Sequence, residues 1–151
     1  MPATTDNLNI PYPIAGDRVA DYPAVAKQAA DKIDQLSYAG TLTARPGWTF
    51  ASVNNPSALV CRVNGGIATL FGAIKRVSSG FNLSAWRNYD IANVTPRPKY
   101  GAAQIAMCNF NNGSIYVLVN SEGVVNIQTY SNSSIHQGGW IILDGIQYVV
   151  D

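Results

Sequence analysis

The chain has 151 residues, of which 13% are charged, and its formal net charge at pH 7 is +1. Three basic and five acidic residues give residues 1–40 a net charge of −2, whereas seven basic and four acidic residues give residues 41–151 a net charge of +3. Neither part is basic enough to bind nucleic acid, and no run of Lys or Arg is present that could follow phosphates.

The composition favours a small β-rich domain with an appendage over one uniform domain. Charged residues make up about 25% of an average soluble domain, and this chain has about half of that fraction. Gly, Asn, Ser and Thr are abundant after residue 40, as expected for many short strands joined by turns. We therefore expect three parts: residues 1–20, 21–40 and 41–151.

Residues 1–20 are predicted to form an extended arm. Pro11 and Pro13 each restrict their own backbone and that of the preceding residue, which rules out a helix there. Such an arm is either a disordered tail or a segment that docks on another protein, and its low charge favours docking. The apolar residues expected to make this contact are Ile10, Tyr12 and Ile14.

Residues 21–40 are predicted to form one helix with a narrow apolar seam. Pro23 is tolerated in the first helical turn, and Gly40 suits a helix terminus. Spacings of three and four residues are typical of a coiled coil, although an amphipathic helix packed on its own domain would give the same pattern. The seam consists of Val19, Tyr22, Ala26, Ala29, Ile33 and Leu36.

Residues 41–151 alternate with a period of two and predict a mainly β head, an antiparallel β-sandwich or jelly roll. The strands are expected at 48–53, 58–64, 66–74, 90–94, 102–110, 114–120, 124–130, 140–143 and 146–150. Tight turns are expected at Asn64-Gly65, Asn112-Gly113, Glu122-Gly123 and Asp144-Gly145, because glycine readily adopts the positive φ that hairpins need.

The strand at residues 114–120 indicates self-association. Every residue from 115 to 119 is apolar, so both faces of this strand are expected to be covered. A sandwich covers only one face of each sheet. A neighbouring copy of the same chain is the natural cover for the other face, and we therefore expect an oligomer.

Several features argue against secretion, membrane insertion and metal binding. The N-terminus lacks a basic start with a long apolar core, so synthesis in a cytoplasm without a signal peptide is expected. No apolar run is long enough to span a bilayer. Cys61 and Cys108 lie in strand-like runs and are expected to be reduced core residues, although a bridge between them stays open. Two cysteines and one histidine make no metal site, and no cofactor is expected.

Catalysis is not expected of this chain. Glu122 and Asp144 lie in predicted turns, and His136 lies in a loop without a second histidine. No Gly-X-Ser-X-Gly nucleophile motif is present. A polysaccharide depolymerase would need two facing carboxylates, and a pair assembled across a subunit boundary stays possible.

Loop aromatics are the better candidates for function. An exposed Trp or Tyr offers a flat surface on which sugar rings stack or partner proteins dock, whereas the same ring buried under a loop would be structural. Basic residues nearby can hydrogen-bond an acidic or hydroxyl-rich ligand. The candidate ligand-binding residues are Trp86, Tyr89, Arg97, Tyr100 and Trp140.

Two stretches of the sequence carry a family resemblance. Residues 10–31 begin Ile-Pro-Tyr-Pro-Ile-Ala-Gly-Asp, and residues 66–150 have a Thr95-Pro96-Arg97-Pro98 corner before two central hairpins and a closing Gly-Ile-Gln-Tyr strand. These stretches resemble parts of tail-fibre and receptor-binding proteins of tailed bacteriophages and of other trimeric fibre proteins of virions. The first is similar to the segment that follows the attachment arm of many short fibres, and the second resembles their β-sandwich heads.

The resemblance implies a parallel homotrimer on the surface of a virion. Its arm would bind other tail or capsid proteins, its short coiled coil would join three chains, and its head would adhere to the host surface, with a saccharide as the expected ligand. The chain is short for a fibre. A capsid decoration protein, a head fibre or a baseplate component without a ligand would have the same layout.

Overall fold

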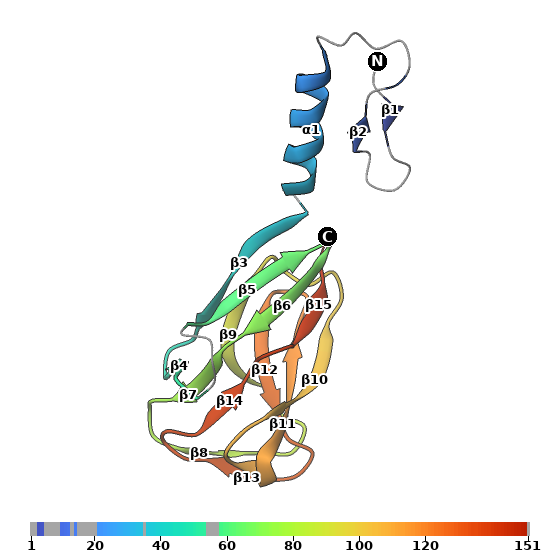
Figure 1. Ribbon diagram of the computed structural model, residues 1–151. Coiled ribbons are helices and arrows are strands. Elements are labelled where there is room, and N and C mark those ends of the chain that lie inside the picture. Colours follow the sequence, from blue (N-terminus) through green and yellow to red (C-terminus); the bar gives the residue numbers. More distant parts are fainter. Residues whose placement is uncertain are drawn as a thin grey trace. The chain divides into compact units, whose positions relative to one another are not determined.

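The computed structural model divides the chain into two compact units, Met1–Tyr38 and Ala39–Asp151 (Figure 1). We describe each unit by itself. The structure describes residues 3–4, 10–12, 14, 21–34, 36–53 and 58–150.

The first unit contains two very short strands and a helix. β1 (Ala3–Thr4) pairs with β2 (Pro11–Tyr12) in antiparallel register, so part of the expected arm has a partner strand within the arm itself. The helix α1 (Tyr22–Asp34) has Pro23 in its first turn, where a missing N–H costs no intrahelical bond. Val25 is its one buried residue among those described.

The helix is shorter than the predicted span of 21–40. Leu36 donates its backbone N–H to the Ile33 carbonyl oxygen and closes the last turn, and strand β3 (Ser37–Ala44) starts at once. Gly40 therefore lies within a strand, and its role as a helix terminus was wrongly predicted. The glycine is required for a different reason, because a Cβ at position 40 would stand 2.3 Å from the Thr95 carbonyl oxygen.

The head is built on an eight-stranded antiparallel sheet in the order β10-β11-β12-β9-β3-β5-β6-β15. Its further strands are β5 (Val60–Asn64), β6 (Ile67–Phe71), β9 (Tyr89–Thr95), β10 (Ala102–Met107), β11 (Ser114–Val119), β12 (Val124–Gln128) and β15 (Gln147–Val149). The smaller elements are β4 (Trp48–Ala51), β7 (Ala73–Arg76), β8 (Phe81–Leu83), the 3-10 turn η2 (Asn111–Gly113), β13 (Ser133–Ile135) and β14 (Trp140–Ile142).

Two strands leave the large sheet and join a smaller one, in the order β14-β7-β4. β6 continues into β7 across Gly72, which has a φ of +108°. β14 continues into β15 through the Asp144-Gly145 turn, and Asp144 Oδ1 accepts a 2.6 Å hydrogen bond from the Gly72 N–H. The two corners are thereby joined, so the small sheet folds over one side of the large one (Figure 1).

The large sheet curls until its two edges meet. The Gln104 side chain in β10 donates to the Gln147 carbonyl oxygen in β15 at 2.9 Å, and the Lys99 N–H donates to the Val149 oxygen. The backbone of Cys108, which follows β10, pairs with that of Ile141 in β14 as an isolated antiparallel β-bridge. The result is a near-barrel whose interior is the hydrophobic core. The two edge strands, β10 and β15, have hydrogen-bond partners where the edges meet.

The strand β11 shows how the sequence pattern is used. Its inward residues Ile115, Val117 and Val119 are at most 2% exposed, whereas Tyr116 and Leu118 point outward and are half-buried. Within one chain the outer face of this strand is therefore only partly covered. What covers it in an assembly stays a prediction.

The fold class is confirmed as mainly β, with one α-helix among the described residues and a large antiparallel sheet. Each expected strand has a counterpart. β9 is one residue longer at each end than predicted, and the run 66–74 is broken at Gly72 into two strands, the second of which extends to Arg76. The other expected strands are shorter than predicted. Strands β3, β8 and β13 were missed. Of the expected turn glycines, Gly65, Gly113, Gly123 and Gly145 all have positive φ.

Candidate functional site

An exposed apolar face lies on the outside of β10 and β11. Ile105 pairs in register with Tyr116, and Met107 pairs with Ser114, so these side chains share one face of the sheet. Ile105 is 69% exposed and Met107 is 62% exposed. Isolated apolar residues on a surface need no explanation, but a contiguous cluster marks an interaction site.

Aromatic rings extend this face toward β12. Trp86 stacks on Tyr116, with ring centroids 6.4 Å apart and an interplanar angle of 26°. Tyr130, which is 63% exposed, lines a shallow depression of about 260 Å³ together with Ile105 and Tyr116. We call this surface the apolar face, and it consists of Trp86, Ile105, Met107, Tyr116, Leu118 and Tyr130.

Trp86 is held outward by the backbone rather than by chance. Its φ is +60°, an uncommon conformation for a bulky residue. The backbone N–H of Trp86 donates to the Thr129 carbonyl oxygen at 2.8 Å, and the Gln128 side chain donates to the Trp86 carbonyl oxygen at 2.8 Å. These two bonds fix the peptide units on both sides of the residue, so the ring stays 63% exposed. Strain retained at an exposed aromatic residue is typical of binding surfaces.

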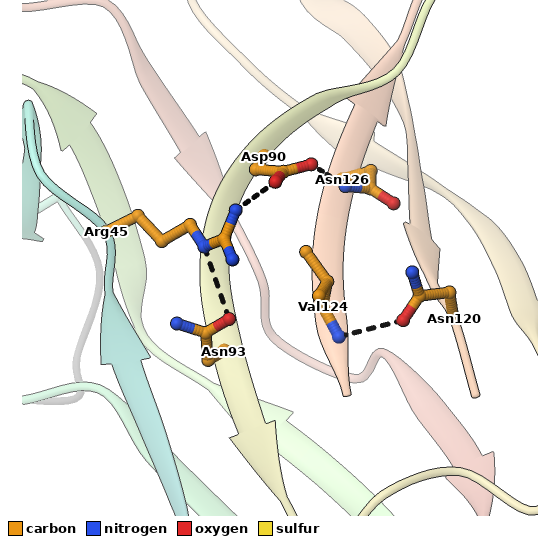
Figure 2. Close-up of polar contacts among 6 residues, drawn as sticks. All are labelled: Arg45, Asp90, Asn93, Asn120, Val124 and Asn126. Atoms are coloured by element: carbon orange, nitrogen blue, oxygen red, sulfur yellow. Dashed lines mark hydrogen bonds and ion pairs between the residues drawn. The ribbon is translucent and has the colours of Figure 1, made fainter. Parts of the chain in front are cut away.

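Beside the apolar face, residues of β9 and β12 form a polar network with Arg45, which follows β3, and Asn120, which follows β11 (Figure 2). Arg45 forms an ion pair with Asp90 and donates through Nε to Asn93 Oδ1 at 3.2 Å. The other Asp90 oxygen accepts a hydrogen bond from the Asn126 side chain, which is only 4% exposed. Asn120 Oδ1 accepts from the Val124 N–H and shapes the adjoining turn. The buried amide of Asn126 is thus satisfied by a carboxylate that already has a cationic partner.

The predicted ligand-binding residues do not form one site. Trp86 belongs to the apolar face, Tyr100 is 68% exposed on the chain leading into β10, and Arg97 is exposed near the Gly123 turn. Trp140 is half-buried at the start of β14, where its backbone N–H donates to Asn109 Oδ1 at 2.7 Å. Of the five residues, only Tyr89 lines a second depression, at the end of β4 and β7.

Tyr89 is oriented by hydrogen bonds at its hydroxyl. The Ser84 N–H donates to that oxygen at 2.8 Å, and the hydroxyl in turn donates to the Asn82 carbonyl oxygen at 3.3 Å. The bond from Ser84 lowers the pKa of the Tyr89 phenol below its ordinary value, and the charge of Arg87 contributes a smaller part. Tyr89 is therefore a fixed residue with a polarised hydroxyl.

Part of the second depression was missed by sequence reasoning. It includes Trp48, Arg76 and Phe81, which come from three separate strands. Trp48 lies directly opposite Arg76 in the β4–β7 pair. No spacing in the sequence relates Trp48 to Arg76, and only the pairing of β4 with β7 brings these two residues together.

The seam residues of the helix are mostly exposed within their own unit. Tyr22, Ala26 and Ile33 are exposed, Ala29 is half-buried, and Leu36 lies beyond the end of the helix. Val19 lies outside the described residues. Of the expected attachment residues, Tyr12 and Ile14 are exposed and Ile10 is half-buried.

The carboxylates of the described head have structural partners or lie in turns. Asp90 is paired with Arg45, and Asp144 accepts from Gly72, whereas Glu122 and His136 are exposed. Within the described residues no group of three or more His, Cys, Asp or Glu side chains is arranged to hold a metal. No helix in the same part of the chain has the length and apolarity to cross a membrane.

Both cysteines are buried and free, as expected for core thiols. The Cys61 sulfur lies 3.6 Å from the Tyr148 hydroxyl, and Cys108 donates to the Phe110 carbonyl oxygen at 3.0 Å. Burial raises the pKa of both thiols above their ordinary value. Neither group is a candidate nucleophile at neutral pH, because the reactive form is the thiolate.

Comparison with known proteins gives no relative for this chain. No family model, no curated protein and no solved structure matches it.

Proposed function

We propose that this chain is a structural protein of a bacteriophage virion, a short homotrimeric tail fibre or receptor-binding protein. Residues before the head attach it to other virion proteins, and the β head adheres to the host surface through a saccharide. The protein is not an enzyme in this proposal. The resemblance of residues 10–31 and 66–150 to such fibres supports it, as does the division of the chain into two units.

The apolar face is the observation that carries the proposal. Ile105, Met107, Trp86 and Tyr130 are each more than 60% exposed in a single chain, although together they form one surface. Covering such a surface is favourable by about 25 cal/mol for each Å² of apolar area removed from water. Contact between heads accounts for this face, with the seam of α1 setting the direction of the three chains.

A second function is favoured by the same observation. Contact between heads is all that a capsid decoration protein, a head fibre or a baseplate component requires, and such a component would need no ligand. The two functions differ in where the protein lies on the particle and in whether the isolated head binds host cells.

Immunogold electron microscopy of the source virion, with antibody against the purified head, tests the proposal. Labelling at the tail tip is expected, together with binding of the fluorescent head to host cells. Labelling over the capsid shell or the baseplate without cell binding would favour the second function. Virions that carry no label would contradict both.

A further inference from the structure

The second depression on the head has the composition of an anion site. It holds about 490 Å³, is open to solvent, and is bordered by Trp48, Arg76, Phe81, Arg87, Tyr89 and Asp90. Three of these residues are aromatic and two are arginines. The chemistry of the site depends on how the guanidinium groups are held and on whether their charge is already neutralised.

Arg76 is held by two rings. Its Cζ lies 5.6 Å from the centroid of Trp48 and 5.0 Å from that of Phe81, both within the range of a cation–π contact. Its Nε donates to the Ser79 carbonyl oxygen at 3.2 Å. The guanidinium also lies against Gly47, where an added Cβ would be 2.6 Å from Nη1. A positioned guanidinium loses less entropy when it binds an anion through its terminal nitrogens.

Arg87 is connected to Arg76 through two further rings. The Arg87 Cζ lies 5.8 Å from the centroid of Tyr89, and the Tyr89 and Phe81 rings are 5.3 Å apart. A continuous series of contacts therefore runs from one guanidinium to the other across the depression. Both arginines line the same open space, where they can act on one ligand.

The charges of the two arginines are not compensated by the neighbouring carboxylate. Asp90 borders the depression, but one of its oxygens is paired with Arg45 and the other accepts from Asn126 (Figure 2). Within the described part of the chain, neither Arg76 nor Arg87 forms a salt bridge. The depression thus has an excess of positive charge, with donors that suit a carboxylate or phosphate group.

A polar depression is lined in part by Asn82 and Ser84, the two residues whose backbone groups bond to the Tyr89 hydroxyl. It has a volume of about 540 Å³, and apart from Leu83 its lining residues carry amides or hydroxyls, namely Asn82, Ser84, Asn132, Ser133 and Ser134. The Tyr89 hydroxyl bonds to the backbone of Asn82 and Ser84, so a residue that lines the second depression contacts the segment that lines the polar one. Neutral donors and acceptors in this arrangement suit the hydroxyl groups of sugar rings.

We propose that Arg76 and Arg87 form the binding site for the acidic group of a host-surface saccharide, whose neighbouring sugar units lie along the Asn82–Ser134 depression. The inference rests on the proposed adhesive function and specifies its ligand class. The shared chemistry is an anionic oxygen group on a polyhydroxylated chain, which either a uronic acid or a sugar–phosphate polymer supplies.

Isothermal titration calorimetry of the full chain with three probes tests this site. The probes are oligogalacturonate for the carboxylate, poly(glycerol phosphate) for the phosphate, and neutral dextran. We expect binding of at least one acidic probe, with the stronger of the two identifying the source of the anion, and none of dextran. Arg87→Gln should weaken that binding about tenfold, because it removes charged hydrogen bonds.

Arg62→Gln is the matched control, because Arg62 is exposed on β5 and does not line the depression. It removes the same charge and should leave binding unchanged. Arg76→Gln should weaken binding at least as much as Arg87→Gln. Because Arg76 also packs on Trp48, the folding of the Arg76→Gln variant is checked by circular dichroism and a melting curve. If Arg76→Gln is unfolded, Arg87→Gln alone decides the outcome.

The site is contradicted if neither acidic probe binds better than dextran, or if Arg62→Gln and Arg87→Gln weaken binding equally. A head that binds host cells with Arg87→Gln in place would remove this inference and leave the proposed adhesion standing. If the head does not bind host cells and antibody against it does not label the virion, the proposed function itself is contradicted.

Discussion

Gly40 lies against the backbone of Thr95 so closely that a Cβ at position 40 would stand 2.3 Å from the Thr95 carbonyl oxygen. The same Cβ would be 2.8 Å from the Cys61 sulfur. β3 lies between β9 and β5 in the sheet, and the contact therefore has neighbours on both sides. Gly40 is the second residue of the head unit, which begins at Ala39.

Gly40→Ala should destabilise the head by roughly 2 kcal/mol or more, because β3 must move away from β9 to admit the methyl group. Gly101→Ala is the control, since its added Cβ would meet only the Val119 oxygen at an ordinary 3.6 Å. Urea unfolding followed by tryptophan fluorescence gives both values. Equal stability of the two variants would show that the contact at Gly40 is relieved without cost.

Replacement of Asp90 should separate the ion pair from the hydrogen bond to Asn126. Asp90→Asn keeps an acceptor for the buried amide and should cost less than about 1 kcal/mol, since the Arg45–Asp90 pair is partly exposed. Asp90→Ala leaves the Asn126 amide without that partner and should cost about 1–3 kcal/mol. Chemical denaturation at pH 7 measures both, and a larger loss in Asp90→Asn than in Asp90→Ala would refute this account.

The buried thiols should make the head less stable at high pH. Burial raises the pKa of Cys61 and Cys108 in the folded state above the ordinary value of 9.0. The unfolded chain therefore releases these protons first. The contribution of the two thiols to the free energy of unfolding is complete below pH 9. It is lost as the pH rises from 9.0 through the higher pKa of the folded state.

The Cys61→Ala/Cys108→Ala variant isolates this effect from the titration of tyrosine and lysine. At pH 7 it should be less stable than the parent chain, because two side chains are truncated in the core. The difference between the two proteins should shrink between pH 8 and pH 10.5, as measured by urea unfolding at each pH. A difference that stays constant over this range would contradict the shifted thiols.

Removal of residues 1–36 should leave a folded head, whereas removal of residues 1–44 should not. The shorter deletion ends before β3 begins at Ser37, and the longer one removes the whole strand between β9 and β5. The shorter deletion should also abolish incorporation into particles, because it removes the proposed attachment residues. Circular dichroism and particle composition measure the two effects. Normal incorporation of the short deletion would place attachment in the head.

Patterns that act over short distances in the sequence predicted much of the head. The unbroken apolar run at residues 115–119 predicted β11, and the Asn-Gly and Asp-Gly pairs predicted turns. β8 and β13 were missed because three residues are too few to show a period. Gly40 was misassigned because a glycine after a helical pattern suggests a helix end, and only the partner strand reveals the close contact with Thr95.

The candidate sites could be predicted only in part. Trp86 and Tyr89 were selected as aromatic residues near a loop, and Trp86 is indeed exposed. Arg76 was not selected, because its importance comes from Trp48 across the β4–β7 pair and from Phe81 beyond the next loop. Long-range pairing of strands places these side chains together, and a single sequence carries no local signal of it.

Self-association through the apolar face is the central claim, and size-exclusion chromatography with light scattering tests it most directly. At micromolar concentration the wild-type chain should have three times its 16.2-kDa mass. The Ile105→Ser/Met107→Ser variant should remain folded, because both side chains are exposed within one chain. It should have the mass of a single chain, because the contact between heads is removed. Ile67→Ser/Val149→Ser, an exposed apolar pair on β6 and β15, is the control and should remain trimeric. A wild-type protein with the mass of one chain would contradict the account.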